Sequence, residues 1–190
     1  MITAFVGCLS DTWITNPMGN GKTLSMTYYL YEDYKEGRKI ITNYHTSFSE
    51  LMNVKQMVDF IMNTDLKNIS IGIDEMQLIF NSLGRKRTKT ELITTMITQT
   101  RKRRVDIYFT TQRWMLIDKI LRDMTAYVIV PQKMHPENGE ECFLDSCPRP
   151  NHEIIVNCMI PYKEMPLRIL HANLVGRLYN SDEIIKEKFD

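Results

Sequence analysis

Three consecutive residues near the N-terminus, Gly21, Lys22 and Thr23, have the types and the order that bind phosphate. They follow a glycine-containing turn and precede an apolar-periodic segment that begins at Leu24. Glycine leaves room for backbone N–H groups to surround an anion, and the start of a helix adds N–H donors and a positive dipole. In such a loop the lysine reaches the β- and γ-phosphates of a nucleotide, and the threonine hydroxyl binds Mg²⁺. The residues expected to contact the nucleotide are Gly19, Asn20, Gly21, Lys22, Thr23 and Leu24.

The loop departs from the full pattern, Gly-x-x-x-x-Gly-Lys-Ser/Thr, at its first position. Asn16 stands where the first glycine is expected, and asparagine tolerates left-handed backbone better than most residues. Alternatively, Gly7 ends the preceding strand and is the first glycine, so that residues 8–16 are an insertion beside the nucleotide. We favour the insertion, which predicts that residues 5–7 lie in the central strand; a central strand at 12–15 would make Asn16 the true start. A third interpretation is a chance Gly-Lys-Thr at the start of an ordinary helix.

Two adjacent carboxylates, Asp74 and Glu75, follow an apolar run at residues 69–73 that predicts a buried strand. In open α/β sheets, ligands bind at the carboxyl ends of the strands. We expect Asp74 in the coordination shell of Mg²⁺, often through water, and Glu75 as the general base that polarises the attacking water. An acidic loop after a strand is common in itself, but its occurrence downstream of Gly-Lys-Thr favours the catalytic interpretation.

Gln112 ends another predicted strand, at residues 105–111, and could contact the γ-phosphate or the attacking water. A polar strand end in solvent is equally compatible with the sequence. Basic residues gather at 85–89 and 101–104. Such runs are commonly solvated faces; their functional interpretations are contact with a phosphate backbone, or an arginine supplied to a neighbour's nucleotide.

Cys142, Cys147, His152 and Cys158 are separated by four, four and five residues, and His135 lies upstream. These side chains are possible zinc ligands, but the spacing matches none of the common short zinc motifs. We therefore favour ordinary thiols in a polar, hairpin-like excursion, with a zinc site and a disulfide as the alternatives. Four cysteines in all are too few and too unevenly spaced for a secreted disulfide scaffold.

Short apolar strands alternate with helical patterns, which predicts an α/β fold with a mostly parallel central sheet and helices on both faces. The predicted strands cover residues 2–6, 39–44, 69–74, 105–111 and 127–130. The predicted helices cover residues 24–35, 49–62, 91–102 and 115–122. Two further strands, at 153–160 and 167–175, predict a C-terminal antiparallel β extension.

A length of 190 residues, with 43% hydrophobic and 25% charged residues, predicts one globular domain. We place its core at residues 1–132 and the β-rich extension at 133–190. The net charge of +1 excludes a global basic field, so a nucleic acid would have to bind a local patch. The sequence shows no apolar run of the ~18 residues that a membrane helix needs and no signal-peptide pattern, so we expect an intracellular, soluble protein.

Five further stretches make the sequence resemble a known family. They are Gly-Arg-Lys-Ile-Ile-Thr-Asn at 37–43, Ile-Asp-Glu-Met-Gln at 73–77, the basic residues 101–104, Asp-Ile-Tyr-Phe-Thr-Thr-Gln at 106–112 and Ile-Asp-Lys-Ile-Leu-Arg at 117–122. With the Gly-Lys-Thr loop, they resemble the ATPase domain of zonula-occludens-toxin-like proteins, a group that includes filamentous-phage assembly ATPases. More broadly, they are similar to the FtsK/HerA class of DNA pumps and to viral genome-packaging ATPases. The resemblance covers residues 1–130.

The resemblance implies a P-loop NTPase fold that binds ATP and Mg²⁺, often as a homo-oligomeric ring. It implies the family's site roles for Lys22, Thr23, Asp74, Glu75 and Gln112. The expected function is a Mg²⁺-dependent ATPase motor of viral or plasmid origin that translocates or packages DNA or drives virion assembly. Its expected partners are DNA and capsid or membrane assembly proteins, in the host cytoplasm or on the virion. The alternatives are a nucleotide-binding structural or interaction protein with weak or no hydrolysis, and a replication helicase or initiator.

One more cation is expected at the γ-phosphate, because motors of this kind often receive an arginine from a neighbouring subunit. If the strand at 105–111 is parallel to the catalytic strands, residues 101–104 lie at the opposite edge of the sheet, about 23 Å away. Arg113 and Arg122 instead follow the edge that binds the nucleotide. We expect Arg122, on a short outward-facing helix, to act in trans, and residues 101–104 to form a polar or DNA-facing surface.

Overall fold

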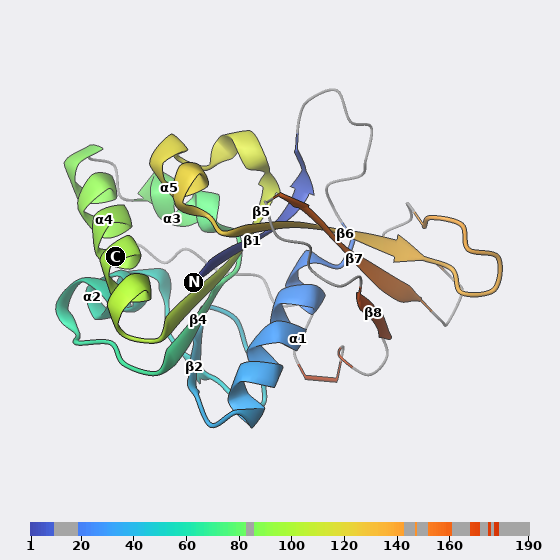
Figure 1. Ribbon diagram of the computed structural model, residues 1–190, viewed down its shortest axis with the longest axis horizontal. Coiled ribbons are helices and arrows are strands. Elements are labelled where there is room, and N and C mark those ends of the chain that lie inside the picture. Colours follow the sequence, from blue (N-terminus) through green and yellow to red (C-terminus); the bar gives the residue numbers. More distant parts are fainter. Residues whose placement is uncertain are drawn as a thin grey trace.

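One continuous sheet organises the chain (Figure 1). The computed structural model describes residues 1–9, 19–82, 86–142, 147, 152–160, 168–171, 175, 177 and 178. In this part of the chain the sheet has eight strands, in the order β3-β2-β4-β5-β1-β6-β7-β8. The strands are β1 (Ile2–Cys8), β2 (Lys39–Thr42), β3 (Glu50–Leu51), β4 (Ile69–Ile73), β5 (Val105–Arg113), β6 (Tyr127–Met134), β7 (Glu153–Ile160) and β8 (Arg168–His171). β1 to β6 run parallel, β7 pairs antiparallel with β6, and β8 pairs antiparallel with β7, which confirms the predicted fold class.

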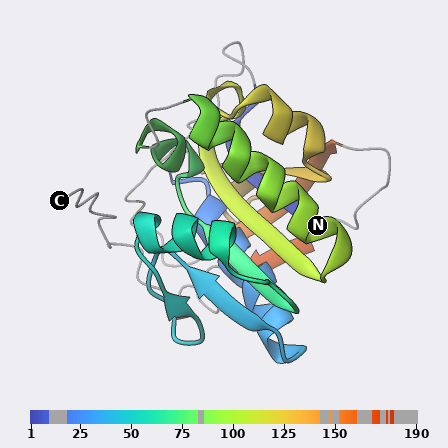
Figure 2. The ribbon, with the colours of Figure 1, turned by 90° about the vertical axis from the view of Figure 1, so that its left-hand side faces the viewer.

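Helices cover both faces of the sheet. α1 (Lys22–Lys35) packs on one face, whereas the remaining helices pack on the other. These are α2 (Val54–Asn63), α3 (Met76–Ser82), α4 (Lys86–Lys102), the short 3-10 helix η1 (Trp114–Leu116) and α5 (Lys119–Met124). Figure 2 shows α2 (teal) and α4 (green) side by side in front of the sheet.

The core is divided into two layers by the sheet. In β1, Ile2, Ala4 and Val6 pack with the layer of α2 to α5, whereas Phe5 packs with α1, as expected from the alternation of side chains along a strand. Gly72 brings α1 close to β4, because a Cβ atom at this position would lie 2.4 Å from Cδ1 of Leu30. The two-sided burial explains why the central strands are continuous apolar runs.

The predicted helix start at residue 49 is wrong. α2 begins at Val54, because Asn53 caps it: the Asn53 side chain accepts from the N–H of Gln56, and the Gln56 side chain accepts from the N–H of Asn53, at 2.9 and 3.0 Å. The hydroxyl of Ser49 instead forms hydrogen bonds with the hydroxyls of Thr42 and Thr46. The sequence patterns also do not reveal β3 or α3, and they merge η1 and α5 into one helix.

β6 continues through Pro131, where the predicted strand ended. Its pairing with β1 stops at Ile129, before a proline would have to donate an N–H that it lacks. Its antiparallel pairing with β7 goes on to Met134, opposite Glu153. The strand therefore belongs to the parallel core on one side and to the C-terminal extension on the other. The connection between β7 and β8, at residues 161–167, and the tail after 178 lie outside the described residues.

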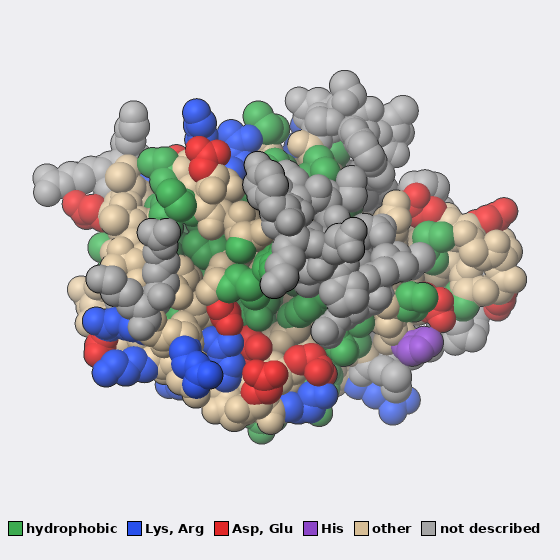
Figure 3. All heavy atoms as spheres, viewed as in Figure 1, with side chains coloured by type: hydrophobic (Ala, Val, Ile, Leu, Met, Phe, Trp, Pro, Cys, Tyr) green, Lys and Arg blue, Asp and Glu red, His purple; other side chains and the backbone are tan. Residues whose placement is uncertain are grey.

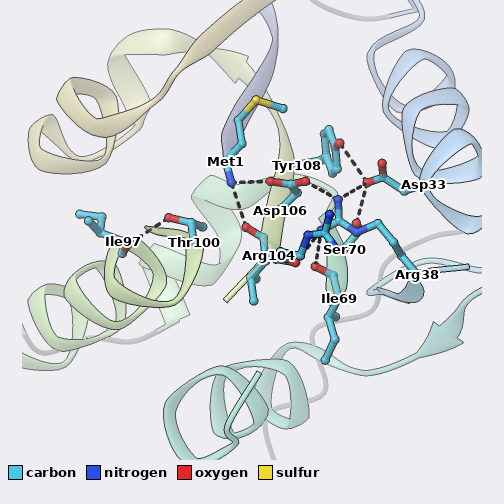
Figure 4. A network of polar contacts seen from close by, with 11 residues as sticks. Met1, Asp33, Arg38, Ile69, Ser70, Ile97, Thr100, Arg104, Asp106 and Tyr108 are labelled. Atoms are coloured by element: carbon cyan, nitrogen blue, oxygen red, sulfur yellow. Dashed lines mark hydrogen bonds and ion pairs between the residues drawn. The ribbon is translucent and has the colours of Figure 1, made fainter. Parts of the chain in front are cut away.

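Arg38 forms the centre of a polar network at the edge of the sheet opposite the Gly-Lys-Thr loop (Figure 4). Its guanidinium pairs with Asp106, lies 3.5 Å from Asp33, and donates to two backbone carbonyl oxygens at 3.0 and 2.8 Å. The amino group of Met1 also pairs with Asp106 and donates to a carbonyl oxygen of β5 at 2.9 Å. These contacts fasten the C-terminal end of α1 to the starts of β1, β4 and β5.

The network predicts a pH-dependent contribution of Asp106 to stability. Burial alone would raise the pKa of this carboxyl, but the Met1 ammonium and the Arg38 guanidinium hold it below its usual range. A depressed folded-state pKa stabilises the protein above the unfolded-state pKa of about 3.9, and this stabilisation is lost as the pH falls through the folded-state value. We expect Asp106→Asn to lower the free energy of unfolding by about 1–2 kcal/mol at pH 7.

The cost of Asp106→Asn should shrink as the pH is lowered below 4, as measured by urea unfolding across a pH series. Asp123→Asn, at an exposed position on α5, is the matched control and should change stability little at any pH. A cost that stays constant down to the acid end would contradict the ion-pair interpretation.

Candidate functional site

The phosphate-binding motif ends at the start of α1, with glycines in the left-handed region. Gly19 and Gly21 have φ angles of +68° and +87°, which glycine adopts without strain. Among the described residues no side chain caps α1, so the N–H groups of its first turn can donate to an anion. Lys22 is buried, and its ammonium donates to Oδ1 of Asn20 at 3.3 Å. This arrangement fits a phosphate on the helix N-terminus.

The predicted position of residues 5–7 in the central strand is confirmed. β1 spans Ile2–Cys8 between β5 and β6, so residues 2–8 form the strand that precedes the loop. Asn16 and most of the predicted insertion fall among residues 10–18, outside the described part of the chain, as does the start of the loop.

A side chain from the C-terminal extension closes on the loop at Gly21. A Cβ atom at Gly21 would lie 2.7 Å from Cδ1 and 3.0 Å from Cγ1 of Ile154, the second residue of β7. Leu24 is buried in the same apolar cluster, with Phe5 and Ile154. The side chain of Leu24 therefore belongs to the core, and only its backbone can contact a nucleotide.

Asp74 lies immediately after β4 and connects three elements. Its Oδ1 accepts hydrogen bonds from the hydroxyl of Thr23 on α1, at 2.9 Å, and from the hydroxyl of Thr110 on β5, at 2.6 Å. Asn43, just after β2, holds the Asp74 backbone through two hydrogen bonds of 2.9 and 2.7 Å. The structure thus brings together Thr23 and Asp74, the two residues predicted to hold Mg²⁺, and adds two supporting residues to which the sequence patterns assign no role.

The carboxyl of Asp74 has a raised pKa. The residue is half-buried, but its carboxylate is desolvated by the surrounding elements, and this is the main cause; the nearby charge of Glu75 acts in the same direction. The hydrogen bonds from Thr23 and Thr110 oppose the shift without cancelling it. A desolvated carboxylate beside a hydroxyl is a hard oxygen donor set that suits Mg²⁺, so Thr23 and Asp74 fit that ion.

Glu75 is the next residue, and its backbone is unusual. Its φ angle is +54°, a conformation that a residue with a side chain rarely adopts and that is found at functional sites. Its N–H donates to the hydroxyl of Thr110 at 2.9 Å. Its carboxylate accepts from the amide of Gln112 at 3.5 Å and also from the amide of Gln77. Gln112 therefore lies beside the candidate base, and Gln77 is a second neighbour that the sequence patterns do not single out.

Arg122 lies apart from this constellation. It belongs to α5, on the face of the sheet opposite α1, and its Nη1 contacts Sδ of Met115 at 2.9 Å. Arg103 and Arg104 precede β5 at the edge opposite the loop, as predicted, and Arg103 pairs with Asp65. Residue 85 and the side chains of residues 86–88, 101 and 102 lie outside the described part of the chain.

The fold matches those of known structures. No protein-family model and no curated protein sequence matches the chain. The N-terminal domain of zonular occludens toxin from Neisseria meningitidis has a TM-score of 0.55 and 20% identity, over 94% of this chain and 98% of that one. The flagellar accessory protein FlaH from Methanocaldococcus jannaschii has a TM-score of 0.52 and 9% identity, over 88% and 83% of the two chains.

A third structure also matches over most of both chains at low sequence identity. The KaiC-like protein PH0186 from Pyrococcus horikoshii has a TM-score of 0.50 and 14% identity, over 90% of this chain and 83% of that one. At these identities the likeness is one of fold. The chain has the fold of the zonular-occludens-toxin-like P-loop ATPases, as its motifs predicted.

The contact at Gly21 predicts a specific response to a methyl group. Gly21→Ala should lower the free energy of unfolding by about 1–2 kcal/mol for the left-handed backbone and by about 1–3 kcal/mol more for overpacking against Ile154. Gly37→Ala is the matched control, because Gly37 has a φ angle of +81° but no atom within 4 Å of the added Cβ. Denaturant unfolding measures the loss of stability in both variants, and the difference between the two losses is the cost of packing against Ile154.

Ile154→Val removes Cδ1, the nearest atom to the added methyl group. In the Gly21→Ala background it should cost less stability than it does in the wild-type protein, because it relieves the clash. Equal costs in the two backgrounds would contradict the contact.

Proposed function

We propose that the chain is a Mg²⁺-dependent ATP hydrolase. The observation that carries this proposal is the hydrogen bond from Thr23, at the N-terminus of α1, to Asp74 at the end of β4, with Glu75 beside it. In P-loop NTPases a Ser or Thr hydroxyl and a strand-end aspartate hold the metal together. The fold shared with P-loop ATPases is consistent with these roles.

Each side chain in the site has a task that its surroundings suit. Lys22, buried at the loop, would offset the charge of the β- and γ-phosphates. Thr23 and Asp74 would hold Mg²⁺, which when bound neutralises the developing charge on the phosphate oxygens. Glu75 would orient a water molecule and accept its proton, and the amides of Gln77 and Gln112 would position the Glu75 carboxylate.

An alternative is a nucleotide-binding structural or interaction protein with little hydrolysis. The loop either is interrupted by residues 8–16 or carries Asn16 in place of its first glycine, and both departures from the full pattern favour weak binding. Calorimetric titration with ATP separates the two functions, because the alternative predicts little or no heat at millimolar ligand.

For the biological role we propose a motor of viral or plasmid origin that translocates or packages DNA, or drives virion assembly. The support is the order of motifs shared with toxin-like and DNA-pumping ATPases. On the face seen in Figure 3 acidic and basic side chains are mixed, so DNA contact would use a local patch.

Every helix among the described residues is too short or too polar to cross a membrane. We place the protein in the host cytoplasm or on the virion, with capsid or membrane assembly proteins as partners.

Arg122 is proposed as the arginine that acts on a neighbouring subunit's nucleotide in a homo-oligomeric ring. Its own α5 lies on the face opposite α1, so it is better placed for a partner than for its own site. Exposed apolar side chains surround it along η1 and α5, at Met115, Leu116, Ile120 and Met124. Clustered apolar exposure next to an arginine is typical of a protein interface.

Glu75→Gln should abolish turnover while ATP binding persists. A general base contributes roughly 10²–10⁴-fold to rate, so we expect at least a 100-fold loss in Mg²⁺-dependent phosphate release with a retained calorimetric signal for ATP. Glu36→Gln, at an exposed position at the far end of α1, is the matched control. Equal turnover in Glu75→Gln and wild type would exclude Glu75 as the base.

Mixing subunits tests the role of Arg122. Arg122→Ala subunits retain Glu75, and Glu75→Gln subunits retain Arg122, so a mixed ring contains some complete sites at its interfaces and should recover part of the ATPase activity. Arg122→Ala subunits mixed with the double variant Arg122→Ala/Glu75→Gln serve as the control, because no complete site can form. A mixture as inactive as this control, with assembly verified by light scattering, would exclude action in trans.

A further inference from the structure

Four potential metal ligands converge where β6 ends and β7 begins. The ligand atoms of His135, Cys142, Cys147 and His152 all lie within 4.8 Å of one another. Sγ of Cys147 lies 3.9 Å from Nε2 of His135, and the centroids of the two imidazole rings are 4.8 Å apart. We propose that these four side chains bind one structural Zn²⁺ ion.

The backbone, rather than a short motif, places the four side chains together. Met134, the last residue of β6, pairs with Glu153 of β7 on one side and with Glu141 on the other. The residues that directly follow or precede this three-way pairing are His135, Cys142 and His152. The N–H of Cys142 donates to a carbonyl oxygen of β6 at 2.7 Å. Three adjacent segments thus each supply one ligand, and Cys147 comes from the connection between two of them.

The donor chemistry and the spacing suit zinc. Two thiolates and two imidazoles form one of the usual closed, tetrahedral zinc sites. With Zn–S and Zn–N distances of about 2.3 and 2.0 Å, such a site separates its ligand atoms by roughly 3.3–3.8 Å. The observed separation of Cys147 from His135 is close to that range, and the largest spread, 4.8 Å, closes with small side-chain rotations.

The burial of the cluster favours the binding of an ion. His135 and Cys142 are buried. Nδ1 of His135 is a buried atom for which the described residues offer no hydrogen-bond partner. An imidazole buried in this way is unfavourable unless a hydrogen bond, water or an ion compensates. A zinc ion bound through Nδ1 would supply that compensation directly, whereas zinc bound through Nε2 would leave Nδ1–H to donate to water or a carbonyl oxygen.

The ligand set differs from the one that spacing alone suggests. Cys158 lies six residues beyond His152 in an extended strand, about 20 Å along it, and its backbone pairs with Ile129 in the middle of β6. Cys158 therefore cannot join Cys142 and Cys147 at the strand end, and His135 takes its place. Among the described residues, Cys142 and Cys147 are thiols that are not joined in a disulfide, as zinc binding requires.

A site with four protein ligands has no open position for a substrate, so its role is structural. It would fasten the polar segment between His135 and His152 against the end of the sheet. His152 is two residues from Ile154, the side chain that contacts Gly21. Loss of zinc should therefore loosen the strand that supports the start of α1.

Metal analysis of the reduced protein, purified from zinc-supplemented cells, tests the proposal. We expect about one zinc per chain, and a drop of at least about tenfold in Cys147→Ser and in His152→Asn. Cys158→Ser is the matched control and should retain the metal. Because a ligand variant could fail to fold, the wild-type apoprotein is also reconstituted with Co²⁺, which should give the visible d–d bands of a tetrahedral site and a thiolate-to-cobalt charge-transfer band.

Three results would overturn the proposal. One is reduced, folded wild-type protein that binds neither zinc nor thiolate-ligated cobalt. Another is zinc that persists in Cys147→Ser or disappears in Cys158→Ser. The last is a disulfide between Cys142 and Cys147 in the native protein, seen by mass spectrometry without reduction. None of these readouts depends on ATP hydrolysis, so they test the zinc site independently of the proposed enzymatic function.

Discussion

The alignment of β4 with β5 is the constraint on which the site depends. Ile73 pairs with Phe109 in parallel register, so the next residues, Asp74 and Thr110, meet at the same sheet edge and form a hydrogen bond. A register shift of one residue would turn every side chain of β4 to the opposite face and separate this pair. Gly72 serves the same alignment, because only a glycine there lets α1 pack closely enough to bring Thr23 to the same carboxylate.

The two edges of the sheet differ in how their charges are satisfied. At the edge with Arg38, opposite charges neutralise one another inside the protein, and this favours the folded chain. At the edge with Asp74 and Glu75, two carboxylates lie side by side, and burial disfavours ionisation of the first. A cation that binds only the folded state would offset the repulsion between these carboxylates, and it would stabilise the folded protein by mass action. The edge that carries the candidate site is thus the one where the protein itself does not fully compensate the negative charge.

The sequence predicts the parallel sheet and the edge at which Asp74, Glu75 and Gln112 gather, because strand order and polar strand ends are local patterns. It does not predict the role of Thr110, because a threonine within a strand has no distinctive pattern. Its role becomes visible only when the register of β4 with β5 shows that it lies beside Asp74. The sequence places His135 upstream of the possible zinc ligands but does not reveal that His135 lies beside His152, because this nearness arises from antiparallel pairing across a long connection. The predicted start of α2 is wrong because it followed apolar periodicity, whereas the hydrogen bonds of the cap at Asn53 fix where the helix begins.

The close approach of Ile154 to Gly21 places a side chain of the C-terminal strands against the candidate phosphate-binding loop. Phosphate-binding loops are often regarded as self-contained modules of strand, loop and helix that tolerate transplantation between scaffolds. Here the first turn of that module rests on a side chain supplied more than a hundred residues later in the chain. Transplanting the N-terminal segment alone would uncover an apolar surface under α1, and a side chain larger than isoleucine at position 154 would have to fit against Gly21.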